Sequence, residues 1–191
     1  MLDQHPFIQG ILHITDIQGY DHMLFLLALT AGLRIAEWRK ALVLATAFTF
    51  GHSITLALAA FNIVHVSGET IEVLIACTIA ATALFKIINT KENQPITWAL
   101  FLGTASFGLI HGLGFSSFFR MMYSNNADVL RSLLYFNLGV EAGQIIIIAI
   151  LLLINFIVVR YLKLSNTFWK NSLAIFALLV SIMLIIERCS A

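Results

Sequence analysis

Three histidines lie inside or at the mouth of long apolar runs: His22, His52 and His111. An ionisable side chain is costly in hydrocarbon, and such residues usually mark a pathway or a binding site. Imidazole is also the commonest metal ligand among side chains. These residues therefore predict a transition-metal site, provided that the fold brings the three rings together.

Two neighbours of His22 are candidates for the same site. Asp21 directly precedes it, and a carboxylate can bind Zn, Ni or Co itself or orient a liganding imidazole. His13 would point about 180° away from His22 in a continuous helix. It can join the site only if the chain breaks near Gly19. The alternative is a solvated cluster at the membrane edge.

Ser53 follows His52 and shares a helix face with Thr49. Its hydroxyl could hold a ring N–H, donate to a carboxylate, or act as a nucleophile beside a histidine. The alternative is a structural role, with Ser53 bonded back to a carbonyl of its own helix.

His111 lies between two glycines, Gly108 and Gly112, that form a GxxxG pair. Small residues let a neighbouring helix approach closely. One interpretation is a histidine directed into a tight interhelical site. The alternative is a packing motif that carries an incidental histidine.

A polar stripe of Asn137, Glu141 and Gln144 follows a helical spacing, and Gly139 and Gly143 lie on the opposite face. Glu141 could be a metal ligand, a proton carrier or a general base, or it could be a hydrogen-bonded structural residue. The two faces are expected to serve different neighbouring helices.

The composition indicates an integral membrane protein. Of 191 residues, 60% are hydrophobic and 11% are charged, whereas soluble domains have about 25% charged residues. We expect a single all-α transmembrane domain over residues 1–191, with the lipid bilayer and a metal ion as partners. The net charge of +1 and the lack of a basic cluster exclude nucleic-acid binding. The state of assembly stays open, and a homo-oligomer is compatible with the sequence.

A membrane span needs about 20 apolar residues. Five runs are long enough, and a sixth at 20–33 is short. We predict a bundle of about six helices, in which residues 6–19 either complete the short span as a broken helix or lie at the interface. The five long runs are 38–61, 69–89, 97–120, 129–160 and 168–187.

Charge predicts the orientation. The segments 34–40, 86–96 and 160–170 carry eight Lys and Arg residues, against three on the opposite side. By the positive-inside rule both termini lie outside a cytoplasmic (inner) membrane. His52 follows Trp38 by fourteen residues and His111 follows Trp98 by thirteen, so both lie about 20 Å above an interfacial tryptophan belt. The site should then face the periplasmic or extracellular side.

Four strings together resemble the HupE/UreJ family of membrane proteins, in order along nearly the whole chain. They are H13…G-Y-D-H22-M-L-F, F48-T-F-G-H-S, F107-G-L-I-H-G-L-G-F and F136-N-L-G-V-E-A-G-Q.

The resemblance implies a six-helix hydrogenase or urease accessory protein that acts as a nickel or cobalt permease. It implies a ligand role for Asp21, His22, His52, His111 and Glu141. The wide spacing from His13 to His22, and the single histidine of the third string, resemble a second, less characterised branch. This leaves the metal open among Ni, Zn and Co.

Three functions follow. The first is a divalent-metal permease, although few polar residues line a route through the inner half. The second is an intramembrane metal-dependent hydrolase or transferase for a lipid or lipid-linked substrate. Three histidines and a water form a catalytic zinc site, with Glu141 or Asp21 as base and Ser53 assisting. The third is a metal-independent assembly factor.

Overall fold

The computed structural model describes residues 5–17, 19–64, 66–89, 95–123 and 129–190. These segments are helical and contain no strand, which confirms the all-α prediction. The helices are α1 (Pro6–Thr15), α2 (Asp21–Thr30), the short 3₁₀ turn η1 (Ile35–Glu37), α3 (Trp38–Ala60), α4 (Gly68–Ile88), α5 (Trp98–Tyr123), α6 (Val129–Arg160) and α7 (Asn166–Ser190).

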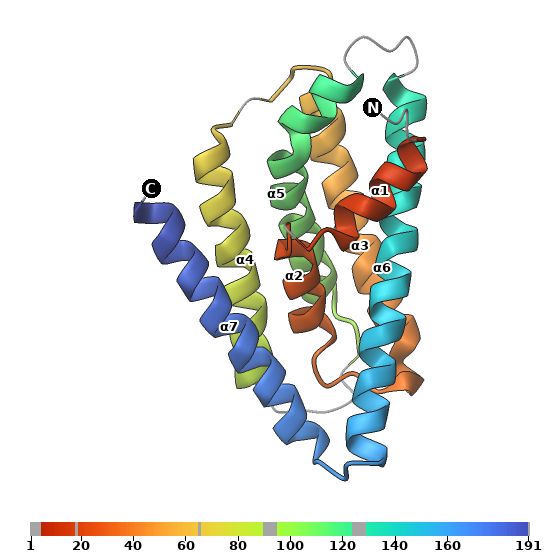
Figure 1. The fold of residues 1–191 in the computed structure, drawn as a ribbon, viewed down its shortest axis with the longest axis vertical. Helices are drawn as coiled ribbons and strands as arrows, with labels where there is room; N and C mark the ends of the chain where they lie inside the picture. The colour runs from red at the N-terminus through yellow and green to blue at the C-terminus, as the bar shows by residue number, and fades with distance from the viewer. Residues whose placement is uncertain (1–4, 18, 65, 90–94, 124–128, 191) are drawn as a thin grey trace.

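Five of these helices, α3 to α7, are long and apolar enough to cross a membrane. They coincide with the five long runs expected from hydropathy. The longest, α6, has 32 residues and a length of about 48 Å at 1.5 Å per residue. Figure 1 shows both chain ends in the upper half of the bundle and the turn from α6 to α7 at the lower end.

The short sixth run at 20–33 contains α2, and the segment that precedes it forms the separate helix α1. The chain leaves α1 at Asp16 in an extended conformation and enters α2 at Asp21. With ten residues, α2 is about 15 Å long, half of the hydrocarbon thickness. This is the broken helix considered for residues 6–19. That α1 and α2 together complete a sixth span stays a prediction.

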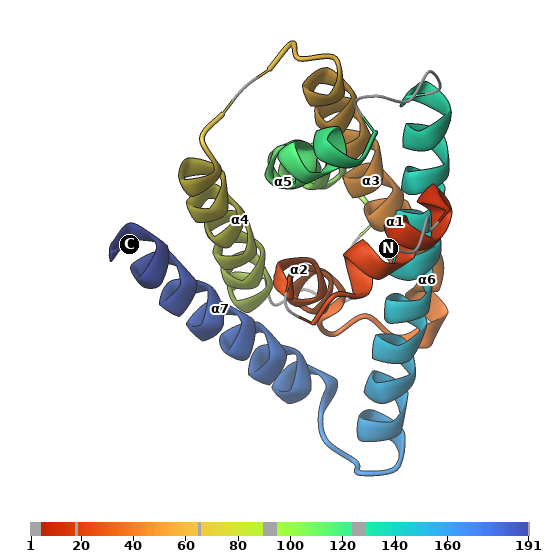
Figure 2. The same cartoon turned by 45° about the horizontal axis from the view of Figure 1, so that its top comes forward.

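The short helix α2 occupies the centre of the bundle (Figures 1 and 2). It packs against α3, α4, α6 and α7, and most of its side chains are buried. A helix that is apolar on all sides is stable only where other helices surround it. The longer helices therefore form a ring around α2, and Phe25 and Leu26 belong to the core that they enclose.

Glycines bring α3 and α5 into direct backbone contact. A Cβ atom added to Gly51 would collide with the carbonyl of Ala105, and one added to Gly108 would collide with the carbonyl of Phe48. Gly112 likewise lies against the carbonyl of His52. The packing role of the Gly108–Gly112 pair is therefore confirmed, and it places His111 beside α3.

The two faces of α6 serve different neighbours, as expected. Gly139 and Gly143 lie against α1, where an added Cβ would collide with Phe7 and Ile14. The polar stripe faces α3, since Gln144 Oε1 accepts a hydrogen bond of 2.8 Å from Thr49. Thus α6 holds α1 on one side and α3 on the other.

This packing predicts that the effect of a Gly→Ala change depends on its position along α5. Gly108→Ala should lower the thermal unfolding temperature of the detergent-purified protein, because overpacking costs about 1–3 kcal/mol. Gly103→Ala is the matched control, since an added Cβ there meets no atom within 4 Å. Equal unfolding temperatures for the two variants would contradict the close α3–α5 contact.

Candidate metal centre

Three histidines from three helices converge in the bundle. Among the described residues, His13 of α1, His22 of α2 and His52 of α3 form the one group of potential ligands whose donor atoms all lie within 4.8 Å of one another. The ring centroids are 4.6 Å apart for His13 and His22, and 5.8 Å apart for His13 and His52. His52 is fully buried and His22 nearly so.

The break between α1 and α2 makes this convergence possible. A continuous helix would direct His13 and His22 to opposite sides, but the extended residue Asp16 separates the two helices. Gly10 then lets α1 lie against the backbone of α6, where an added Cβ would collide with Phe136. His13 is thereby directed toward the centre of the bundle. The sequence predicted that His13 could join the site only if the chain breaks near Gly19, and this break is present.

His111 of α5 lies beside this group rather than within it. Its ring centroid is 5.2 Å from that of His22. Its Nδ1 lies 2.9 Å from the carbonyl oxygen of Phe107, so the Nδ1–H donates and Nε2 carries the lone pair. In this tautomer Nε2 is the nitrogen that a metal could use. His22 is therefore in contact with His13 on one side and with His111 on the other.

Five imidazole nitrogens of the cluster are buried without a hydrogen-bond partner. Within the described part of the chain, Nε2 of His13, His22 and His111 and both ring nitrogens of His52 are buried without a hydrogen bond. A buried polar atom left unpaired costs about 1–3 kcal/mol. A metal ion could accept the lone pair of one nitrogen from each imidazole. Ligands about 2.0–2.1 Å from a tetrahedral ion lie about 3.4 Å apart, so the group must contract only slightly.

Phenylalanines form dry walls around the histidines. Phe115 lies 3.9 Å from the His13 ring, centroid to centroid, and stacks on Phe136 at 5.0 Å. Phe48 lies 4.9 Å from His111 and 6.2 Å from His52. These rings offer no competing hydrogen bonds and keep the local dielectric constant low. The phenylalanine rings therefore cannot satisfy the unpaired imidazole nitrogens in place of a bound metal ion.

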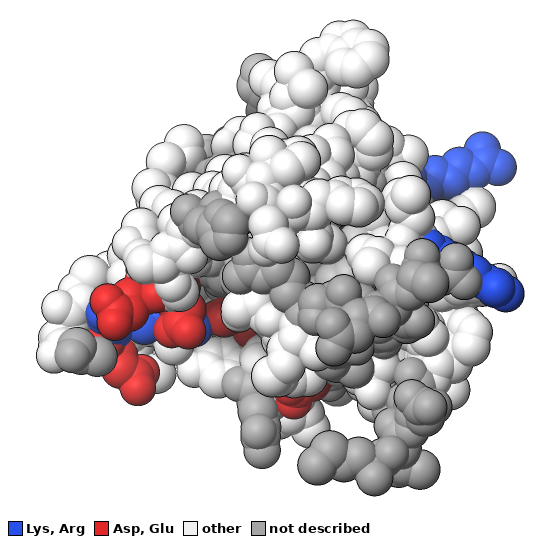
Figure 3. Space-filling view, turned by 90° about the horizontal axis from the view of Figure 1, so that it is seen from above, with Lys and Arg blue, Asp and Glu red and all other residues white. Residues whose placement is uncertain are grey.

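Asp21 does not belong to the group of three histidines, and its Oδ2 pairs with a cation. Its Oδ2 accepts a hydrogen bond of 2.9 Å from Nη2 of Arg188. Arg188 also lies 3.6 Å from Oε2 of Glu72, so the end of α7 is tied to α2 and α4. Adjacent helical residues do not share a face, which explains why Asp21 and His22 diverge. Figure 3 shows the acidic side chains gathered on one side of this end.

Glu141 and Ser53 also have partners outside the histidine group. Glu141 accepts a hydrogen bond from the hydroxyl of Thr46 on α3. Ser53 donates to the carbonyl of Thr49 at 2.6 Å, the back-bonded arrangement that was its structural alternative. The ligand role of Glu141 and the catalytic roles of Glu141, Asp21 and Ser53 therefore stay predictions.

Sequence reasoning missed the partner of Asp21 and the aromatic walls. Arg188 is 167 residues from Asp21 in the sequence. No local sequence pattern around either residue predicts that they form an ion pair. Phe136 precedes the polar stripe of α6 and Phe115 ends the third string. Their position within the strings that carry the histidines and Glu141 was the sequence signal that could have placed them at the site.

Comparison with known proteins identifies one family. The family model described as HupE / UreJ protein matches residues 3–188. No curated protein and no solved structure gives a significant match. The match agrees with the resemblance of the four strings and covers nearly the whole chain.

The Arg188–Asp21 pair predicts energetic coupling between α7 and α2. Each side chain is only 18% exposed, so Asp21→Asn and Arg188→Gln should each lower stability. Their effects should be non-additive by about 1–2 kcal/mol, as for partly buried charged hydrogen bonds. A double-mutant cycle of thermal unfolding in detergent measures this coupling. Arg131→Gln, which removes a cation stacked on Tyr135, is the control and should add independently to Asp21→Asn; additivity of both pairs would contradict the coupling.

Proposed function

Because the chain belongs to the HupE/UreJ family, as the match over residues 3–188 establishes, we propose that its histidine cluster binds a divalent transition-metal ion and that the protein carries this ion across the membrane. The family is associated with nickel and cobalt transport or with accessory functions. The observation that carries the proposal is the buried group of His13, His22 and His52 with unpaired ring nitrogens.

The donor set favours borderline metals. Imidazole nitrogen suits Ni, Co and Zn, whereas Mg and Ca prefer oxygen ligands. His13, His22 and His52 supply nitrogen alone, and His111 is near enough to His22 to supply one more. A site of this kind selects a transition metal by ligand type. The choice among nickel, cobalt and zinc then depends on coordination geometry and metal supply.

The ion would enter from the end of the bundle where Asp21 and Glu72 lie. Carboxylates at a mouth raise the local concentration of cations. Arg188 neutralises part of this charge. The entrance and the histidines are adjacent, since Asp21 directly precedes His22. We place this mouth on the periplasmic or extracellular side of the cytoplasmic membrane, following the charge bias of the sequence.

Transport requires that three aromatic rings move. Phe25 and Phe48 stack at 4.8 Å, and Phe107 lies 6.3 Å from Phe25. Phe25 and Phe48 both contact the His111 ring. Phe107 also lines a cavity that opens toward the opposite end of the bundle. These rings therefore separate the metal centre from that cavity, and we assign them the role of the inner barrier.

Hydrolysis is less well supported than transport. A metal-dependent hydrolase needs a base that can activate the bound water. In the described part of the chain no carboxylate belongs to the histidine group, and Asp21 and Glu141 have other partners. We therefore do not propose an enzymatic reaction.

Metal analysis tests binding. Protein purified without chelators should contain about one transition-metal ion per chain, as a single tetrahedral site holds. His22→Gln and His52→Gln should lose it, because each removes an imidazole ligand from the group. Elemental analysis by mass spectrometry measures the content. His5→Asn is the matched control, since His5 is exposed and caps α1. Equal metal content in all four proteins would refute the site.

Uptake into proteoliposomes tests transport separately. Vesicles that contain the wild-type protein should accumulate Ni²⁺ or Co²⁺, because the centre replaces the hydration shell of the ion during passage. His22→Gln should reduce uptake to the level of protein-free vesicles, whereas His5→Asn should match the wild type. A protein that holds the metal tightly but never carries it inward would contradict the permease and favour a resident metal.

A further inference from the structure

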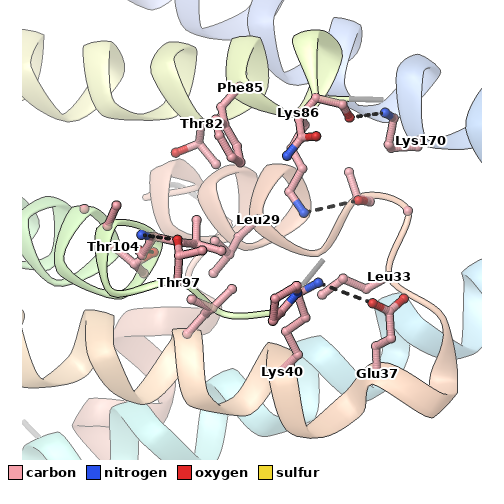
Figure 4. Close-up of a pocket in the computed structure, with 18 of the residues that line it drawn as sticks. Leu29, Leu33, Glu37, Lys40, Thr82, Phe85, Lys86, Thr97, Thr104 and Lys170 are labelled. Carbon is pink, nitrogen blue, oxygen red and sulfur yellow. Dashed lines mark hydrogen bonds and ion pairs between the residues drawn. The ribbon is translucent and has the colours of Figure 1, made fainter. Parts of the chain in front are cut away.

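A second site lies at the opposite end of the bundle from the Arg188–Asp21 pair. A cavity of about 430 Å³ opens where α2, α3, α4, α5 and the start of α7 meet. Its volume falls in the range of about 300–1,000 Å³ that is common for small-molecule sites. Figure 4 shows Lys40, Lys86 and Lys170 converging on it from three helices. None of the histidines of the metal centre lines it.

The mouth of this cavity is strongly basic. Lys40, Lys86, Lys170 and Arg34 line it, and Glu37 is the one acidic residue among its lining residues. Glu37 lies 3.4 Å from Nζ of Lys40. The other two lysines donate to uncharged carbonyls, Lys86 to Ala31 and Lys170 to Asn89. Four positive side chains thus face one negative one, which leaves an excess of positive charge.

The interior of the same cavity is apolar. Its walls include Leu29, Leu44, Leu100 and Phe107. The hydroxyls of two lining threonines are directed to their own helices. Thr82 donates to Thr78, and Thr104 donates to Leu100, each at 2.8 Å. These groups supply no free donor, so the inner part suits a hydrocarbon chain and the mouth suits an anion.

We propose that this cavity binds an anionic phospholipid, with the phosphate among Lys40, Lys86 and Lys170 and one acyl chain between Leu29 and Phe107. Basic pockets between membrane helices are known to bind anionic headgroups electrostatically. A divalent cation is a poor occupant, since the excess positive charge repels it. A free phosphate would satisfy the lysines but would leave the apolar depth unfilled.

Lipid binding to the delipidated protein in detergent tests this proposal. Native mass spectrometry should show that phosphatidylglycerol binds more tightly than phosphatidylcholine. Lys86→Gln should weaken phosphatidylglycerol binding about fivefold, the usual effect of one lysine charge. Arg39→Gln is the matched control: Arg39 lies at the same end but is exposed and stacks on Trp38, so its loss should leave the preference unchanged. Equal binding of the two lipids, or equal effects of the two variants, would overturn the proposal.

A second comparison separates the lipid from a free anion. Glycerol phosphate, which has the anion but no tail, should not displace phosphatidylglycerol. Thr104→Phe should weaken binding without changing any charge, because Thr104 lines the apolar interior. Thermal unfolding confirms that each variant is folded. Displacement by glycerol phosphate, together with unaltered lipid binding by a folded Thr104→Phe variant, would show that the site takes a small anion and would overturn the phospholipid assignment.

Discussion

Backbone contact at glycines determines where the histidine rings lie. Gly51 and Gly108 bring α3 and α5 together, and Gly10 and Gly139 do the same for α1 and α6. Each contact removes the space that a side chain would occupy, so four separate helices can place an imidazole in one small volume. Without these contacts the rings would lie further apart. The convergence of His13, His22 and His52, whose donor atoms lie within 4.8 Å of one another, with His111 beside them, is thus a product of helix packing.

The two ends of the bundle differ in charge and suit different ligands. At one end Asp21 and Glu72 surround Arg188, and carboxylates there attract cations. At the other end the lysines surround an apolar cavity, and their excess charge favours an anion. An ion that left the histidines would meet this basic end. If the proposed transport and the proposed lipid site both hold, a bound phosphate there would lower the electrostatic barrier to the departure of the ion.

Hydropathy and spacing predicted the elements well, because each span depends only on local composition. The five long runs match α3 to α7. The common depth of His52 and His111 in a membrane, predicted from their distances to Trp38 and Trp98, stays a prediction. Local reasoning could not find partners far away in the chain. Asp21 was grouped with His22 because they are adjacent, and its ligand role stays a prediction. Its partner Arg188 lies 167 residues away. The packing of α1 on α6 likewise depends on Gly10 and Gly139, which lie at the same helix contact. The hydrophobic periodicity of either helix does not predict this contact.

The arrangement of the four histidines bears on release as well as on binding. A rigid site with ideal distances holds its ion tightly, whereas a carrier must let it go. Here the donor atoms of His13, His22 and His52 lie within 4.8 Å, somewhat wider than the separation of about 3.4 Å in a tetrahedral zinc site. In the proposed permease, binding would therefore require a small contraction, which would weaken the complex. His22 contacts both His13 and His111, so it could keep one bond to the ion while the remaining ligands exchange. Such a shared ligand would let an ion move between two positions without passing through an uncoordinated state in the low-dielectric interior.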